Sequence, residues 1–370
     1  MTDVMRRRQF LKASVAFAGA TAAGGFSCIE IASGAPVQAP VVDKLTVNVL
    51  VDSSHDLFFK PSQVHGVSIE PGPRATDFRQ ILHNQWGLAL FLESQRRSEQ
   101  RSLMLDYGYS PDALLNNISI LKVDPSKVSA LVLSHGHYDH YGGLFGFLDT
   151  YRDKLPADVK LYTGGEDNFC HRLNPSGGGQ FTDFGTLDRR ELVKRHVTTV
   201  LAETPTVIEG HAFTTGRIKR TSLEKVLPNG FVERKMVDGL GCDASRYATA
   251  ELQGKIVPDE HVHEHATCFH VKDKGLVVIS SCGHVGIVNS VRQAQEVSGV
   301  RKVHAIVGGF HLGPAPKDYL DTVVAEIKKL EPDAVIPMHC SGNNFVQAMR
   351  EQMPDNLIVT TTGSRITFGA

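Results

Sequence analysis

The stretch SHGHYDHYGG, from Ser134 to Gly143, gathers the side chains of this 370-residue chain that are best suited to chemistry. His135 and His137 stand two apart just after an apolar run, and in extended backbone such side chains point to the same side. Asp139 and His140 follow where the chain turns towards a helix. Imidazole with a carboxylate suits zinc or a similar ion, so the spacing predicts a metal site. A solvated histidine-rich loop is the alternative, but it fits poorly because a buried strand delivers the cluster to one point.

The elements that must position this cluster are predicted from the periodicity of apolar residues. Strands are expected at 45–52, 87–94, 102–108, 127–134, 198–203, 205–216, 302–310, 333–342 and 356–363, with a hairpin at 266–281. Helices are expected at 111–121, 144–155, 287–299 and 316–331, with one more before the last strand. Gly, Pro and polar content marks 174–185 and 217–251 as loops. This order indicates the α/β class, and we expect one domain over 40–370 with an elaborated middle region around 165–260.

Composition narrows the classes of function. The 39 Lys and Arg residues balance 40 Asp and Glu residues, and aromatic residues make up only 7% of the chain. Neither feature suggests a nucleic-acid partner, so we expect a small-molecule substrate. Six cysteines occur without a CxxC pair, and Cys28 lies in the N-terminal leader. The five that remain are an odd number, so at least one thiol is free unless two chains pair.

The N-terminus has the features of a targeting segment. Arg6, Arg7 and Arg8 precede a short Ala- and Gly-rich apolar run, and small residues follow it. The order RRQFLK resembles the bacterial twin-arginine export signal. A membrane anchor needs about 20 apolar residues, which this run does not supply. We therefore expect residues 1–39 to be a cleaved signal, with the twin-arginine export machinery as partner, a periplasmic or secreted product, and no stable membrane anchor after cleavage.

A family resemblance rests on His135–His140, HGHYDH, which matches the H-x-H-x-D-H signature of the metallo-β-lactamase superfamily. The resemblance implies an αββα sandwich that carries one or two metal ions at the rim of its sheets. We call His135–His140 the histidine loop. Asp106, near the end of SLMLDYG, is similar to the superfamily aspartate that supports this loop without binding metal. His137 stands where the oxygen-reducing di-iron members have a carboxylate, which disfavours a redox role.

A narrower resemblance comes from four segments, LSHGHYDHYGGL, VVISSCGHVGIVNSV, IVGGFHL and IPMHCSG. Together they are similar to a branch named for dihydropterin-methyl ribofuranosylaminobenzene-phosphate synthase. This branch loosely implies a phosphate-bearing, pterin-like substrate. Export would be an odd setting for a step of cofactor biosynthesis, so we give that substrate less weight.

The resemblance also implies which remote residues complete the site. One ion is expected on His135, His137 and His284 or a neighbouring ligand, and a second on Asp139, His140 and His339. The sequence does not fix which remote histidine serves which ion.

Three alternatives stay open for the remote ligands. Cys282 stands where most members have a bridging aspartate and competes with His284. His263 or His265 could be the third-motif histidine, or could belong to a polar loop near the site. His311 either binds metal or, as we prefer, acts on the substrate from the rim as a catalytic residue.

The expected function is that of a dinuclear zinc hydrolase that uses a metal-bound hydroxide on an ester, lactone, phosphoester or amide. Asp139 would orient the water and take up a proton. Two other classes are kept: a metal-dependent synthase or transferase acting on a phosphate-bearing pterin-like substrate, and a non-catalytic periplasmic protein that binds a metal or ligand.

Overall fold

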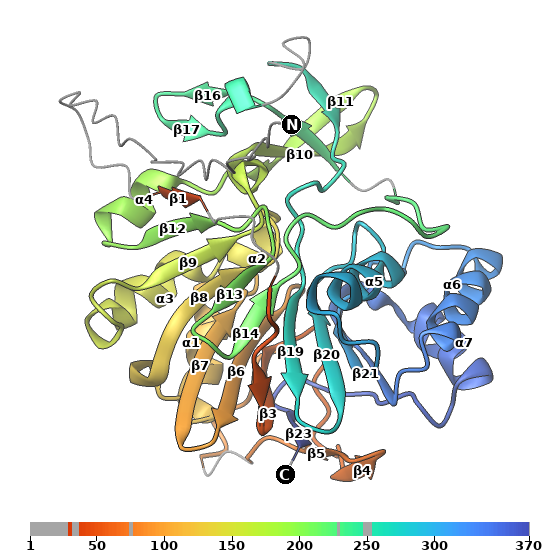
Figure 1. Cartoon of the computed structure of the whole chain (residues 1–370). Helices are drawn as coiled ribbons and strands as arrows, with labels where there is room; N and C mark the ends of the chain where they lie inside the picture. Colours follow the sequence, from red (N-terminus) through yellow and green to blue (C-terminus); the bar gives the residue numbers. More distant parts are fainter. Residues whose placement is uncertain (1–28, 32–36, 74–76, 228–229, 247–253, 370) are drawn as a thin grey trace, which may run out of the picture.

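The computed structural model describes residues 29–31, 37–73, 77–227, 230–246 and 254–369. Two β-sheets face each other at its centre, and helices cover the outer face of each sheet (Figure 1). The α/β class and the αββα sandwich expected from the sequence are therefore confirmed. The export signal predicted for residues 1–39 lies almost wholly outside the described residues. Among the described helices, none has the length and apolar character that crossing a bilayer requires.

The larger sheet has ten strands in the order β1-β12-β9-β8-β7-β6-β3-β23-β5-β4. They are β1 Ile29–Ile31, β3 Lys44–Val51, β4 Ser62–Val64, β5 Val67–Glu70, β6 Ala89–Arg96, β7 Glu99–Leu105, β8 Val128–Leu133, β9 Lys160–Thr163, β12 Thr198–Leu201 and β23 Arg365–Gly369. Strand β6 pairs antiparallel with both β3 and β7, and β7 runs parallel to β8. The carboxyl ends of β3, β7 and β8 consequently lie at one edge of the sheet.

The smaller sheet has the order β13-β14-β19-β20-β21-β22, and β2 also pairs with β19. Its strands are β2 Val41–Val42, β13 Thr206–Ile208, β14 Ala212–Thr214, β19 Thr267–Val271, β20 Gly275–Ser280, β21 Val303–Gly308 and β22 Ala334–Pro337. Strands β20, β21 and β22 are parallel neighbours, so the segments that follow them emerge side by side.

Helices cover both outer faces of the sandwich (Figure 1). The described helices are α1 Pro111–Ile120, α2 Tyr138–Tyr141, α3 Leu144–Tyr151, α4 Arg189–Lys194, α5 Ile287–Ser298, α6 Lys317–Lys329 and α7 Asn343–Gln352. Helices α1 and α3 pack on the larger sheet, and α5, α6 and α7 pack on the smaller one. Helix α1 begins where its sequence predicts, since Ser110 accepts from the Ala113 backbone N–H and Pro111 occupies the first turn.

Alternation along the strands divides the core into layers. On β7, Leu103 and Leu105 face the other sheet, whereas Met104 faces helices α1 and α3. On β20, Val277 and Ile279 likewise lie between the sheets. Because every second side chain of a strand points to the same face, strands that are apolar throughout fill both layers.

The middle region contains strands where the sequence predicted loops. Residues 174–185 lie mostly within the hairpin of β10 His171–Gly177 and β11 Gln180–Gly185, which makes the loop prediction wrong. The segment 217–251 contains β15 Phe231–Glu233, β16 Met236–Val237 and β17 Leu240–Gly241; β10, β11 and β15 form a four-stranded sheet with β18 Ile256–Pro258. The exposed side chains of β11 give no apolar alternation, so periodicity could not reveal these strands.

A disulfide between Cys170 and Cys242 ties this middle region together. The sequence did not predict this disulfide, because the two cysteines stand 72 positions apart in the chain. The other described cysteines, Cys268, Cys282 and Cys340, are free and buried.

Two predicted strands differ in the structure. The segment 205–216 divides into β13 and β14, which form a hairpin. The strand predicted at 356–363 is wrong, because the last strand is β23 at Arg365–Gly369. Residue Leu357 forms only an isolated bridge with Val335, and Ile358 packs into the core without a strand. Apolar content alone does not distinguish a buried loop from a strand.

Candidate metal centre

Side chains from both sheets meet at one edge of the sandwich, beyond the ends of the central strands. From the larger sheet come Asp106 after β7 and the histidine loop after β8. From the smaller sheet come Cys282 and His284 after β20, His311 after β21, and His339 and Cys340 after β22. The carboxyl ends of parallel strands meet at the same edge, which explains how residues about 200 positions apart in the chain become neighbours.

Asp106 organises the histidine loop from behind. Its carboxylate accepts from the Ser134 backbone N–H at 2.8 Å, the Ser134 Oγ–H at 2.7 Å and His140 Nδ1 at 2.8 Å. With its proton directed at Asp106, Ser134 Oγ can accept from His135 Nδ1, which lies 3.0 Å away. Both imidazoles therefore keep the lone pair of Nε2 for another partner. Asp106 thus lies where the family resemblance placed it, behind the loop.

The glycines of the histidine loop are required for space. A Cβ on Gly136 would lie 2.5 Å from Arg172 Nη1, and one on Gly142 would lie 2.1 Å from the Tyr109 carbonyl oxygen. Gly142 and Gly143 both have ordinary helical φ angles, of −56° and −82°. These glycines are therefore needed for the close approach of other chain segments rather than for an unusual backbone conformation.

The first group of metal donors consists of His135, His137 and His284. Their donor atoms lie within 4.8 Å of one another, and all three side chains are buried. The ring of His284 lies 5.0 Å from that of His135 and 4.8 Å from that of His137. The structure therefore brings His284 from the smaller sheet onto the histidine pair of the larger one.

The second group consists of Asp139, His140 and His339, again with donor atoms within 4.8 Å. His339 Nε2 lies 3.3 Å from Asp139 Oδ2. Asp52, at the end of β3, accepts from the His339 backbone N–H at 2.7 Å and so fixes the start of this loop. The sequence did not point to Asp52, because an aspartate after a strand has no distinctive pattern around it.

Unpaired polar atoms show that the residues fit a bound ion. Buried polar groups in proteins are nearly always hydrogen-bonded, since leaving one unpaired costs about 1–3 kcal/mol. Yet His135 Nε2, His140 Nε2 and Asp139 Oδ1 are buried and make no hydrogen bond within the described part of the chain. A cation would satisfy the two imidazole nitrogens, and Asp139 Oδ1 could bind the ion or a water beside it, because a neutral imidazole and a carboxylate are both metal ligands.

The charge states also suit a cation. Burial lowers the pKa of His135, His137 and His284 well below the usual value, and neighbouring histidines act in the same direction. These imidazoles are therefore neutral at pH 7. Burial raises the pKa of Asp139, but His140 and His339 outweigh it and hold that pKa well below its usual range. The edge thus presents three neutral imidazoles and one ionised carboxylate. Burial lowers the pKa of His339, but Cys340 and Asp139 outweigh it and raise that pKa to about 10.

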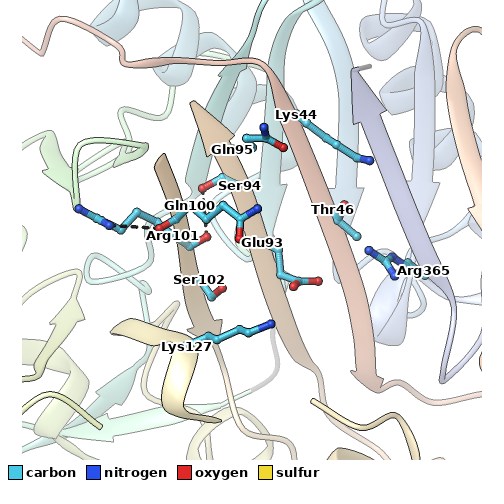
Figure 2. A pocket seen from close by; sticks show the side chains of 10 residues that line it. All are labelled: Lys44, Thr46, Glu93, Ser94, Gln95, Gln100, Arg101, Ser102, Lys127 and Arg365. Atoms are coloured by element: carbon cyan, nitrogen blue, oxygen red, sulfur yellow. Dashed lines mark hydrogen bonds between the residues drawn. The ribbon is translucent and has the colours of Figure 1, made fainter. Parts of the chain in front are cut away.

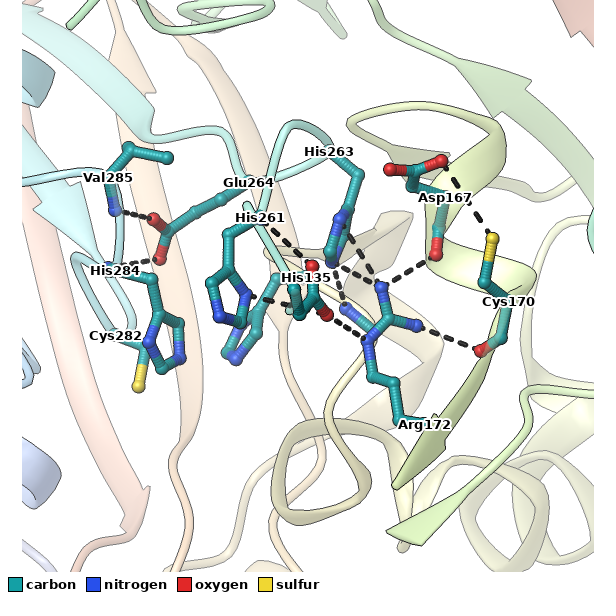
Figure 3. A network of polar contacts seen from close by, with 12 residues as sticks. His135, Asp167, Cys170, Arg172, His261, His263, Glu264, Cys282, His284 and Val285 are labelled. Carbon is teal, nitrogen blue, oxygen red and sulfur yellow. Dashed lines mark hydrogen bonds and ion pairs between the residues drawn. The ribbon is translucent and has the colours of Figure 1, made fainter. Parts of the chain in front are cut away.

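The second histidine cluster supports the site but does not place His263 or His265 in either donor group. His263 Nε2 accepts from the Gly136 backbone N–H at 3.1 Å, and Arg172 Nη2 lies 2.9 Å from the same nitrogen (Figure 3). His265 Nε2 lies 2.9 Å from the Leu133 carbonyl oxygen. Both side chains hold the backbone on either side of His135, which is a positioning role.

His261 and Asp259 are the residues of this region that sequence reasoning missed. The ring of His261 stacks on His284 at 4.0 Å, and His261, Asp259 and His137 form a further candidate metal group. Asp259 accepts from buried Arg172 Nε at 3.0 Å. The HVH spacing in 261–263 repeats the HGH spacing of 135–137, which was the available signal.

Glu264 determines how the SCGH loop is oriented. Its carboxylate accepts from the backbone N–H groups of His284 at 3.1 Å and Val285 at 2.8 Å (Figure 3). Cys282 also lies in reach of the larger sheet, since it forms a candidate group with His135 and His140. Both alternatives for the remote ligand are therefore present at the centre, His284 beside His137 and Cys282 beside His140.

Several residues around the centre adopt backbone conformations that are uncommon outside glycine. The φ angles are 58° for Asp106, 49° for His261, 48° for His311 and 48° for His339. Such conformations cost about 1–2 kcal/mol each and are concentrated at functional sites. His311 lies half-buried at the rim, with its ring 4.2 Å from that of His284.

Aromatic side chains lie beside both donor groups. Trp86 is 56% exposed, and its ring lies 4.8 Å from that of His339. Phe184 lies 5.5 Å from the ring of His137. An exposed indole next to a metal centre can stack on a flat or apolar part of a substrate.

A cavity of about 390 Å³ lies at the opposite end of the central strands (Figure 2). Lys44, Lys127 and Arg365 lie on its wall, at or next to the first residues of β3, β8 and β23. The wall contains no histidine or cysteine, so this cavity is separate from the metal centre.

Comparison with known proteins agrees with the fold and the histidine loop. The family model of the metallo-beta-lactamase superfamily matches residues 89–218, which span β6 to just beyond β14. A solved metal-dependent hydrolase of the beta-lactamase superfamily has a similar fold, with a TM-score of 0.62 at 22% identity over 87% of this chain and 98% of that chain. The family match is confined to residues 89–218, and the solved structure is similar to this chain in fold.

Curated relatives come from the archaeon Methanocaldococcus jannaschii. The chain is 28% identical over 279 residues to 7,8-dihydropterin-6-methyl-4-(beta-D-ribofuranosyl)-aminobenzene-5'-phosphate synthase. The aligned region covers 72% of this chain and 86% of that relative. It is 25% identical over 260 residues to an uncharacterized protein of the same organism, which covers 66% of this chain and 85% of that relative.

Proposed function

We propose that the protein is a metal-dependent hydrolase that acts on a small-molecule ester, lactone, phosphoester or amide and uses two divalent ions, with zinc as the preferred metal. The observation that carries the proposal is the meeting of two three-residue donor groups from facing sheets. His135, His137 and His284 would hold one ion, and Asp139, His140 and His339 would hold the other.

The side chains have separate tasks in this proposal. Bound ions would supply Lewis-acid chemistry, which acidifies water and stabilises negative charge on a substrate oxygen. Asp139 keeps one unpaired carboxylate oxygen, with which it can hold a water and take up its proton. His311 stands half-buried at the rim, from where it can donate to the substrate.

The test combines metal analysis with a substrate screen on the full protein. Purified protein, treated with chelator and then reloaded with zinc, is assayed on esters, lactones, phosphodiesters and amides. We expect turnover only after reloading, and a loss in kcat/KM of about 10²–10⁴-fold in Asp139→Ala. His65→Ala is the control, because His65 is exposed and its Nε2 lies 3.1 Å from the Asp355 carbonyl oxygen, away from both donor groups. Metal-loaded protein that binds a small ligand but hydrolyses none of these classes would refute the hydrolase proposal and support a binding protein.

A second candidate is a metal-dependent synthase or transferase. The name of the 28% identical relative favours it, since that protein is called a synthase of a phosphate-bearing pterin compound. The two candidates differ in the acceptor. A hydrolase transfers the group to water, so hydrolysis in ¹⁸O water labels the product, whereas a transferase needs a second substrate.

We also propose that the protein is exported by the twin-arginine route to the periplasm or beyond. The Cys170–Cys242 disulfide supports an oxidising location, where disulfides form and persist. Cell fractionation of the wild-type chain and of a variant with Arg7 and Arg8 changed to Lys tests this. Retention of the variant inside the cell is expected, and equal export of both would contradict the proposal.

A further inference from the structure

Two buried thiols lie beside the metal centre without a role in the proposed reaction. Cys282 follows β20 and Cys340 follows β22, and their Sγ atoms lie 3.0 Å apart. His311, which follows the strand between them, has its Nδ1 3.8 Å from Cys282 Sγ. The donor atoms of these three residues lie within 4.8 Å of one another.

The surroundings of the pair are not those of a core cysteine. Cys268, the third free cysteine, is buried in the apolar cluster under α5 and α6. Cys282 and Cys340 belong to none of the apolar clusters found among the described residues. His311 Nε2 is buried and makes no hydrogen bond in the described ranges. Two thiols with the Nδ1 of an imidazole next to them resemble a donor set more than a packed core.

The backbone also leaves room for the pair. A Cβ on Gly309 would lie 2.9 Å from Cys340 Sγ and 2.2 Å from the Ser281 carbonyl oxygen. Glycine at position 309 therefore allows the loops that follow β20, β21 and β22 to lie close together. The His311 backbone N–H points at Cys340 Sγ from 3.2 Å, a contact that favours a sulfur carrying negative charge.

We propose that Cys282, His311 and Cys340 form a third metal-binding site, next to the two histidine groups, for a thiolate-preferring ion such as zinc. Cys282 also forms a candidate group with His135 and His140, so its sulfur would be shared between this site and the histidine loop. Thiolate sulfur and imidazole are the softer ligands of protein zinc sites, whereas the carboxylate of Asp139 makes the site that it shares with His140 and His339 a harder one. Each thiol releases its proton to solvent when it binds the ion.

The geometry requires only a small movement. Zinc–sulfur bonds of about 2.3 Å at a tetrahedral angle place two sulfurs about 3.8 Å apart. The present separation is 3.0 Å, so the pair would open by about 0.8 Å on binding. A disulfide between the same cysteines is the competing use of the pair.

Metal content and cobalt spectroscopy test the site independently of any activity. The full protein is purified with reductant, freed of metal and reloaded with Zn²⁺ or Co²⁺. We expect wild-type protein to bind one more ion per chain than Cys340→Ser and His311→Gln. We also expect Co²⁺-loaded protein to show thiolate-to-cobalt charge-transfer absorption that Cys282→Ser abolishes. Cys268→Ala is the matched control and keeps both the ion count and the absorption.

Two results would overturn the proposal. One is equal metal content in wild-type, Cys340→Ser and His311→Gln together with no thiolate-to-cobalt absorption. The other is a Cys282–Cys340 disulfide, seen by mass spectrometry, that persists under reductant and excludes metal from the thiols. His311→Gln changes a half-buried rim residue, so it remains informative if a buried cysteine variant fails to fold.

Discussion

Replacing Asp106 with asparagine tests the argument that the residues behind the histidine loop set its metal affinity. Asparagine has nearly the same shape, and its carbonyl oxygen can still accept from the Ser134 backbone N–H, which lies 2.8 Å from Oδ1. Its amide NH₂ would then face His140 Nδ1, which lies 2.8 Å from Oδ2. Two donors cannot share one hydrogen bond, so His140 would move its proton to Nε2 and lose the lone pair that faces Asp139.

The expected size of the effect follows from this tautomer change. Changes to residues that hold a metal ligand weaken metal binding by about 10–100-fold, which corresponds to about 1.4–2.7 kcal/mol. Fold stability should fall less than in Asp106→Ala, which leaves three buried donors unpaired at about 1–3 kcal/mol each. Asp106→Asn should therefore remain folded but bind its second ion weakly.

Chelator competition measures the metal affinity, and circular dichroism measures stability. Asp333→Asn is the matched control, because Asp333 pairs with buried His304 Nδ1 at the same 2.8 Å but lies outside the metal centre. An Asp106→Asn protein that binds both ions as tightly as the control would refute the reasoning.

Four further predictions rest on other contacts. Metal removal should lower the melting temperature, because an ion at 100 times its Kd stabilises the native state by about 2.7 kcal/mol; unchanged melting in EDTA would contradict this. Burial raises the pKa of Glu224 to about 7 from an unfolded value near 4.5. Its contribution to stability is therefore present at acid pH and is lost as pH rises from about 4.5 to 7. Glu224→Gln should make the melting temperature depend less on pH in this range. Cys170→Ser should lower the free energy of unfolding by up to about 4 kcal/mol, measured in urea, since the disulfide closes a long loop. Trp86→Ala should raise KM for apolar substrates more than it lowers kcat, and the reverse pattern in steady-state kinetics would assign the indole to positioning His339.

Local signals were sufficient for most of the elements around the centre. The apolar run before Ser134 and the hairpin at 266–281 were predicted correctly, because buried strands leave uninterrupted apolar runs. The exposed hairpin β10–β11 was missed, because its strands carry few apolar residues and are held by backbone pairing. The prediction of a strand at 356–363 was wrong for the opposite reason. Its residues are apolar like those of a buried strand, but they pack into the core as a loop.

Candidate metal donors were easier to find than the residues that hold them. His135, His137, Asp139 and His140 stand in one short segment, so their spacing alone indicated a shared ion. Asp52, Asp259 and the fully buried Arg172 reach the site because the fold brings distant parts of the chain together. A single aspartate after a strand, or a single arginine within one, does not differ from a surface residue in sequence, so no local pattern could have identified these three.

The amino-acid sequence by itself determined the α/β class, the histidine loop His135–His140 with its four candidate metal donors, and the buried strand before that loop. These depend on interactions between residues close in the chain, chiefly the alternation of a strand and the spacing of ligands. Only the tertiary structure decided that His284 lies beside His137 while Cys282 lies beside His140, and that Cys282 also lies next to Cys340. Those contacts arise where parallel strands from two sheets end at one edge, so they depend on strand order and sheet packing, which no short segment of sequence encodes.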